Sequence, residues 1–291
     1  MLSLKQEKHS KQQQERPFAI MNFIDKLNAV WRRNRSMVCV GLDPDLTKLP
    51  ELLRHQTMPI FEFNRAIIDA TAPYVCAYKP QAAYYAGQDA DDQLKMTIDY
   101  LHERYPDIPV ILDVKRGDIG STAAQYALEA FERYRADAVT VNPYMGTDAL
   151  KPFLDYADRG VIILCRTSNP SSCELQELIY EGRTIYEHVA VLARDKWNYN
   201  GNALLVVGAT YPEELGRIRR LCPEMPFLVP GVGAQGGDVE KVVANGTTPD
   251  GFGLIINSSR GIIYADKGEN FAPAAGEAAR ILRDLINDFK K

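Results

Sequence analysis

Short apolar runs alternate along the chain with longer segments in which apolar residues recur every three or four positions. The short runs, bounded by Gly, Pro or Asp, are typical of buried strands, and the longer spacing is typical of amphipathic helices. The predicted strands are residues 37–43, 74–79, 110–112, 137–142, 161–165, 203–207, 227–230 and 253–256. The predicted helices are residues 22–34, 60–72, 93–105, 123–134, 147–156, 184–197, 212–222 and 274–289. We expect Ser121 and Thr122 to cap the helix over 123–134.

This alternation predicts an α/β protein built as a single (β/α)₈ barrel (TIM barrel), because each strand–helix unit has roughly the 30 residues of a βαβ repeat. A doubly wound sheet is the alternative, although such sheets more often use fewer strands. Nothing after residue 21 reads as a low-complexity linker, so residues 21–291 are expected to form the barrel domain. Residues 1–20 are polar and rich in Gln, without the apolar stretch of a secretory signal, and are expected to form a disordered extension.

Composition narrows the class of protein. The net charge of -4 over 291 residues gives no overall basic field for nucleic acid. There is no run of about 18 apolar residues that would span a membrane. Of the five cysteines, Cys39, Cys76 and Cys165 lie inside apolar runs, as reduced core residues do. These features predict a cytoplasmic protein.

Charged residues gather where three consecutive predicted strands end. Asp43 follows the first strand, Lys79 ends the second, and Asp113, Lys115 and Asp118 follow the third. Barrel enzymes carry their chemistry at these ends. Asp113 and Lys115 are two positions apart, so they share a face if the strand continues. A salt-bridged strand end would explain one such charge, but five at one barrel mouth favour a catalytic cluster.

The seventh and eighth strands are followed by Gly-rich turns instead. Residues 231–237 expose backbone N–H groups, Gln235 offers a side-chain donor, and Arg260 provides a planar fork for an oxyanion. The spacing of Gly231 and its following glycines matches the dinucleotide fingerprint, but a match in the seventh unit is weak. Plain turn chemistry would explain the glycines, whereas Arg260 beside them favours a phosphate site, which barrels usually build from these two loops.

No metal or cofactor is expected. His9, His55, His102 and His188 do not lie at strand ends, and each is predicted to be a surface residue. No carboxylate–histidine cluster has metal-ligand spacing. We find no flavin or pyridoxal motif.

Five motifs together resemble the orotidine 5′-phosphate decarboxylase family. They are Asp43, Lys79-Pro-Gln, Asp113-x-Lys115-x-x-Asp118, Pro230-Gly-Val-Gly-Ala-Gln-Gly-Gly237 and Arg260. The similarity extends from Met37 to Tyr264, and residues 140–146 and the long connection after the fifth strand are similar to the longer bacterial-type branch. The resemblance implies a cofactor-free (β/α)₈ homodimer that converts orotidine 5′-phosphate to uridine 5′-phosphate, the last step of de novo UMP biosynthesis.

The same resemblance implies catalytic roles. Asp113 would lie against the substrate carboxylate, and Lys115 would protonate C6 of the pyrimidine. Lys79 would hold the charge network and, with Asp43, hydrogen-bond the ribose hydroxyls.

It also implies roles in the partner's site and in substrate binding. The catalytic Asp118 and the substrate-binding Thr122 would reach the active site of the partner subunit. Ser168 would contact the base, while Gln235 and Arg260 would hold the phosphate.

Three alternatives share parts of this pattern. A metal-dependent sugar-phosphate decarboxylase or epimerase has the same D-x-K-x-x-D spacing, but the absence of extra carboxylates around Lys79 argues against it. A Schiff-base aldolase would also need a lysine at a strand end. A non-catalytic nucleotide-binding barrel would keep Arg260 and the Gly-rich turns but would not need five buried charges.

Overall fold

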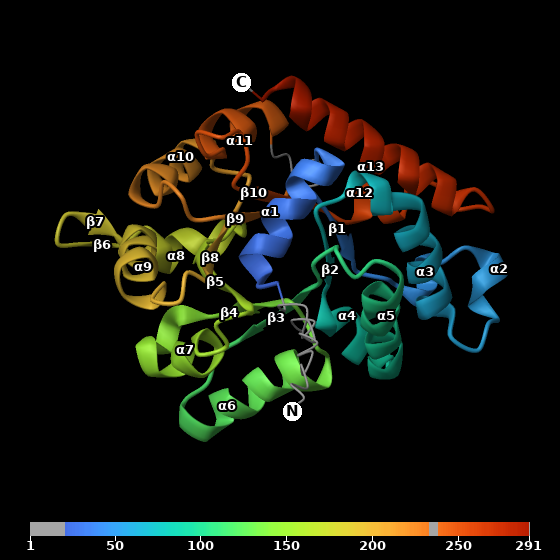
Figure 1. Ribbon diagram of the computed structural model, residues 1–291, viewed down its shortest axis with the longest axis horizontal. Helices are drawn as coiled ribbons and strands as arrows, with labels where there is room; N and C mark the ends of the chain where they lie inside the picture. The colour runs from blue at the N-terminus through green and yellow to red at the C-terminus, as the bar shows by residue number, and fades with distance from the viewer. Residues whose placement is uncertain (1–20, 233–237, 291) are drawn as a thin grey trace, which may run out of the picture.

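The computed structural model describes residues 21–232 and 238–290, in which parallel strands form a barrel ringed by helices (Figure 1). The strands are β1 (Val38–Leu42), β2 (Ala77–Pro80), β3 (Ile111–Arg116), β4 (Ala138–Val141), β5 (Gly160–Arg166), β8 (Ala203–Val207), β9 (Phe227–Pro230) and β10 (Leu254–Ser258). They are hydrogen-bonded in the order β2-β1-β10-β9-β8-β5-β4-β3. Parallel bridges from Tyr78 to Val110 and from Gln81 to Asp113 join β2 to β3. The predicted barrel is therefore confirmed, and the doubly wound sheet is excluded.

In the part of the chain that the structure describes, eight helices cover the outside of the barrel. They are α3 (Pro59–Thr71), α5 (Asp91–Arg104), α6 (Gly120–Leu128), α7 (Thr147–Leu154), α9 (Ile185–Leu192), α10 (Pro212–Leu221), α11 (Val239–Gly246) and α13 (Phe271–Asp288). Shorter pieces are α2 (Glu51–Arg54), α4 (Ala82–Ala86), α8 (Cys173–Gln176) and α12 (Arg260–Ile263). Within the described residues, no helix is long and apolar enough to cross a bilayer.

The N-terminal end of the barrel is closed by α1 (Phe23–Asn34), which lies across the ring of strands in Figure 1. Its buried residues Phe23, Leu27, Val30 and Trp31 recur at helical spacing, so one face of the helix packs against the strand starts. The Phe23 ring fills the space where a side chain at Gly160 would lie. Because α1 covers this end, we expect the chemistry at the opposite end, where the carboxyl ends of the strands converge.

Each predicted strand corresponds to a strand of the barrel. The largest differences are that β2 begins at Ala77 instead of residue 74 and that β3 continues to Arg116 instead of ending at residue 112. The prediction missed the antiparallel hairpin of β6 (Ile179–Tyr180) and β7 (Arg183–Thr184), as well as the short helices. The predicted cap at Ser121 and Thr122 is wrong, because α6 already begins at Gly120 and the preceding Ile119 makes no side-chain capping bond. The predicted extension over residues 1–20 lies outside the described residues.

Cys39, Cys76 and Cys165 are buried free thiols, as predicted. Cys222 is also a buried free thiol, and Cys173 is exposed. His55 is exposed, as predicted. The prediction for His102 is wrong, since its ring is half-buried with Nε2 3.5 Å from Oδ2 of Asp137. His188 is also half-buried and contacts the carbonyl of Tyr180.

Candidate active site

The C-terminal end of the barrel holds a chain of three charges on β2 and β3. Nζ of Lys79 lies 2.8 Å from Oδ2 of Asp113, and Nζ of Lys115 lies 2.6 Å from Oδ1 of the same carboxylate. The Lys79 and Asp113 side chains are 5% and 7% exposed, whereas Lys115 is 44% exposed. One carboxylate therefore joins a buried ammonium to one that reaches the open mouth.

Neighbouring charges stabilise the ionised forms of Asp113 and Lys79. Burial raises the pKa of Asp113, but the charges of Lys79 and Lys115 outweigh it and hold that pKa well below the ordinary value. Burial lowers the pKa of Lys79, and attraction to Asp113 and Asp43 more than reverses this, so the net shift is upward. Burial raises the pKa of the nearby Cys39 thiol to about 12, so the thiol stays neutral. At neutral pH Asp113 and Lys79 are therefore charged, and the Cys39 thiol is neutral.

The backbone of β3 is irregular at this point. Between Leu112 and Arg116 the strand advances four positions while its partner β4 advances two, from Val139 to Val141. Lys115 lies inside this bulge with a φ of 48°, a conformation that residues with a Cβ rarely adopt. The regular two-residue alternation that predicted a shared face for Asp113 and Lys115 therefore does not hold, and the two side chains meet because the strand bulges.

Thr140 on β4 belongs to this cluster and was not among the predicted site residues. Its Oγ1 donates to Oδ1 of Asp113 at 2.8 Å and accepts from the backbone N–H groups of Val114 and Lys115 at 3.0 Å each. The only hint in the sequence is a hydroxyl residue inside an otherwise apolar strand.

Beside the charges lie three buried polar atoms without a hydrogen-bond partner among the described residues. They are Oδ1 of Asp43, Oδ1 of Asn257 and Oγ of Ser259. Asn257 and Ser259 crowd the end of β1, because a Cβ at Gly41 would lie 2.8 Å from Cβ of Ser259 and 3.2 Å from Oδ1 of Asn257. Buried polar atoms are normally satisfied, so this edge of the mouth is suited to a ligand that brings hydrogen-bond donors. Sequence reasoning missed Asn257 and Ser259.

The structure describes only part of the predicted phosphate site. Arg260 begins α12, is exposed, and makes no ion pair with any described residue. Gly231 has a φ of 95°, which only glycine adopts readily. Gln235 lies outside the described residues.

Asp118 and Thr122 do not join the charge network. Oδ1 of Asp118 accepts from the N–H of Ile119 at 2.8 Å, and Thr122 is exposed on α6. In the part of the chain that the structure describes, neither makes a hydrogen bond or ion pair with Lys79, Asp113 or Lys115.

Ser168 follows β5 and is half-buried against Gly208, where an added Cβ would lie 2.9 Å from that of Ser168. The loop that carries it is held by Arg166, a completely buried guanidinium that sequence reasoning missed. Arg166 pairs with Glu177 at 2.6 Å and with Glu214, and it stacks on Tyr211 with its Cζ 4.1 Å from the ring centre. Arg166 therefore ties the loop that follows β5 to the start of α10.

Among the described residues, no group of three or more His, Cys, Asp or Glu side chains is arranged to hold a metal ion.

Comparison with known proteins identifies the family. Residues 36–274 match the family described as "Orotidine 5'-phosphate decarboxylase / HUMPS family". The chain belongs to this family. It is 57% identical over 270 residues to the orotidine 5′-phosphate decarboxylase of Dechloromonas aromatica, with 93% of this chain and 100% of the relative covered. Identity to the protein of the same name from Ralstonia pickettii is also 57%, with the same coverage.

A solved structure agrees with these relatives. The OMP decarboxylase of Leishmania donovani superposes with a TM-score of 0.80 at 41% sequence identity, covering 92% of this chain and 98% of that one. The similarity to the orotidine 5′-phosphate decarboxylase family therefore includes all eight strands of the barrel.

Proposed function

We propose that the protein decarboxylates orotidine 5′-phosphate to uridine 5′-phosphate in de novo pyrimidine synthesis. The observation that carries this proposal is the Lys79–Asp113–Lys115 network at the barrel mouth, with Lys115 reaching the open side. The names of the relatives point to the same reaction.

The chemistry suits this network. When the bond from C6 to the carboxylate breaks, the electron pair stays on C6 in the plane of the ring, where no π system absorbs it. The ammonium of Lys115 stabilises that developing charge and then transfers a proton to C6, so CO₂ leaves and uridine 5′-phosphate remains. Asp113 beside the departing carboxylate repels it more before the bond breaks than after, although such destabilisation is a contested source of rate.

The rest of the substrate has matching groups. Arg260, with Gln235, is assigned to the phosphate, so that binding energy remote from C6 holds the substrate in place. Asp43 and Lys79 are assigned to the ribose hydroxyls, and the unpartnered Oδ1 of Asp43 supports this. Ser168 is assigned to the base.

We further propose a cytoplasmic homodimer with composite sites, in which Asp118 and Thr122 act in the partner's mouth. Exposed apolar side chains flank them on the loops after β3 and β4, namely Ile119, Tyr144 and Met145. Such a patch suits an isologous contact between two copies. Buried reduced thiols are typical of the cytoplasm.

The decisive experiment for the activity follows the absorbance of orotidine 5′-phosphate in the presence of EDTA. Loss of the substrate chromophore at an undiminished rate supports metal-free decarboxylation. Turnover that requires added magnesium would instead favour the metal-dependent sugar-phosphate branch that shares the family. A lysine adduct trapped by borohydride would favour the aldolase.

The composite site is tested by mixing Lys115→Ala with Asp118→Ala, each expected to be inactive as a homodimer. In the heterodimer one site carries both lesions and the other carries none, so about half of the wild-type activity per heterodimer should return. Folded heterodimers that stay inactive would place Asp118 in its own subunit's site.

A further inference from the structure

Thr140 is one of the most constrained side chains at the barrel mouth. It is 1% exposed, and its Oγ1 makes three hydrogen bonds, to Oδ1 of Asp113 at 2.8 Å and from the N–H groups of Val114 and Lys115 at 3.0 Å each. A hydroxyl has one proton and two lone pairs, so its bonding capacity is complete. Because both backbone partners can only donate, the hydroxyl proton must point at Asp113. The orientation of this group is thus fixed by its surroundings.

The two hydrogen bonds from the backbone to Thr140 replace the strand-to-strand hydrogen bonds that the bulge in β3 interrupts. Across Leu112–Arg116 the β3 backbone is out of register with β4, so Val114 and Lys115 have no ladder partner there. Thr140 lies on β4 opposite this stretch and satisfies both N–H groups with one oxygen. It thereby supports the φ of 48° at Lys115, which aims Nζ back at Asp113, 2.6 Å away.

The third bond acts on the carboxylate itself. Oδ2 of Asp113 faces Lys79, and Oδ1 receives both Lys115 and Thr140. With a donor on each side, the carboxylate plane has little freedom to rotate.

We propose that Thr140 is a positioning residue for this reaction, whose hydroxyl sets the geometry between Asp113 and Lys115 by binding the backbone of one and the carboxylate of the other. Its methyl group is not required, so only the hydroxyl should matter. The inference rests on the proposed function, because its main readout is turnover of orotidine 5′-phosphate.

The test compares Thr140→Val, which keeps the shape and loses the hydroxyl, with Thr140→Ser, which keeps the hydroxyl. Thr71→Val is the matched control, since Thr71 is also buried but its Oγ1 bonds the Ile67 carbonyl and the Tyr78 hydroxyl. We expect Thr140→Val to lower kcat about ten- to a hundredfold, with the Kd for uridine 5′-phosphate changed less than about threefold, because the product is bound by other groups. Thr140→Ser and Thr71→Val should keep kcat within about threefold of wild type, since neither removes the Thr140 hydroxyl.

The pH profile gives a second readout. The Lys79 and Lys115 ammoniums contact Asp113 in every variant and the Cys39 thiol lies near it, so losing the Thr140 donor alone should raise the pKa of Asp113 and move the acid limb of kcat/KM to higher pH.

A folded Thr140→Val enzyme with wild-type kcat would overturn the proposal, as would a Thr140→Ser enzyme as impaired as the valine variant. If the valine variant does not fold, Thr140→Ala removes the same hydroxyl without adding bulk and carries the same expectation. If wild type itself does not turn over orotidine 5′-phosphate, the proposed function fails. A crystal structure of Thr140→Val would then decide the positioning role alone, since retention of the positive φ at Lys115 and of its contact with Asp113 would refute it.

Discussion

Two buried aspartates, Asp113 and Asp137, lie at opposite ends of the barrel and look alike by most measures. Their side chains are 7% and 12% exposed, and each is surrounded by cations. Asp113 has Lys79 and Lys115. Asp137 has Lys26 at 2.9 Å, with His102 at 3.5 Å and an Arg159 guanidinium nitrogen at 4.0 Å.

Their titration is alike as well. Burial raises the pKa of Asp137, but the hydrogen bond with His102 and the charge of Lys26 outweigh it, so this pKa too is lower than usual. Neither burial, nor pairing, nor the direction of the shift separates the two groups. A perturbed carboxylate alone is therefore weak support for catalysis.

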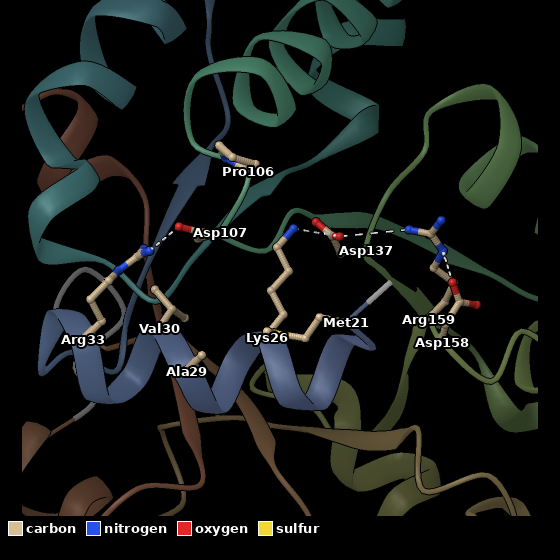
Figure 2. A pocket seen from close by; sticks show the side chains of 10 residues that line it. All are labelled: Met21, Lys26, Ala29, Val30, Arg33, Pro106, Asp107, Asp137, Asp158 and Arg159. Carbon is tan, nitrogen blue, oxygen red and sulfur yellow. Dashed lines mark hydrogen bonds and ion pairs between the residues drawn. The ribbon is translucent and has the colours of Figure 1, made fainter. Parts of the chain in front are cut away.

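The partners make the difference. Asp137 precedes β4 and accepts a hydrogen bond from the backbone N–H of Val110 at 2.8 Å, while Lys26, His102 and Arg159 reach it from α1, from α5 and from the residue before β5. Figure 2 shows Lys26 and Arg159 reaching it from opposite sides of a pocket of about 520 Å³ at the base of the barrel. Asp137 thus joins elements that are distant in sequence. Asp113 instead makes its hydrogen bonds among the C-terminal ends of three adjacent strands, β2, β3 and β4. The backbone of β3 bulges there, and the ammonium of Lys115 beside Asp113 reaches the barrel mouth.

The largest expected effect is on the catalytic side of this comparison. Lys115→Ala should abolish turnover while uridine 5′-phosphate still binds, because the ammonium acts mainly on charge that appears during the reaction. Its 44% exposure means that the fold loses little. Steady-state kinetics and equilibrium binding measure both quantities. Residual activity within tenfold of wild type would remove Lys115 as the proton donor.

At the N-terminal end of the barrel we expect the opposite result, a loss of stability with little loss of turnover. Asp137→Asn should lower the free energy of unfolding by about 3 kcal/mol, as when one partner of a buried ion pair is removed, and leave kcat of the folded enzyme near wild type. Urea unfolding and kinetics on the same sample measure the two. The control is Asp107→Asn, which breaks an exposed pair with Arg33 and should cost at most about 0.5 kcal/mol. A large loss of kcat with unchanged stability would reverse the assignment of the two ends.

Arg260 provides a third case to compare with Asp113 and Asp137. It lies at the barrel mouth and has no carboxylate partner among the described residues. Arg260→Ala should cost about 2–5 kcal/mol in kcat/KM for orotidine 5′-phosphate, as for a lost charge-assisted clamp. Orotidine, which lacks the phosphate, should be equally poor for variant and wild type. A variant that still prefers the phosphorylated substrate as strongly as wild type would refute the clamp.

The sequence predicted the barrel because each strand is a short apolar run with a helix after it, a signal that is local. The charged residues Lys79, Asp113 and Lys115 were also predictable, because strand ends converge in this fold. The hairpin of β6 and β7 was missed, since two residues per strand are too few to show alternation.

What the sequence could not provide were contacts that depend on irregular backbone or on distant segments. The bulge at Lys115 breaks the period of two, and Thr140 reaches it from the next strand. Likewise, nothing around Asp137 indicates that Lys26, more than a hundred positions earlier, would be its partner. The sequence places Asp137 only as the first residue of the predicted strand over 137–142, and it predicts His102 to be a surface residue.

The smallest effect concerns the pH dependence of stability, and it tests whether Asp137 is ionised in the native protein. A carboxyl whose pKa is lowered by folding contributes stability above its unfolded value of about 3.9, and this contribution is lost as the pH falls through the lower folded value. Lys26, His102 and Arg159 face this position in both proteins, but the asparagine of Asp137→Asn cannot titrate. The difference in unfolding free energy between wild type and Asp137→Asn should therefore shrink as the pH falls below about 4. Urea unfolding at pH 7, 5 and 3.5 follows it. A difference that grew between pH 5 and pH 3.5 would mean that Asp137 is protonated in the native state, and the ion pair with Lys26 would then not explain the stability of this end of the barrel.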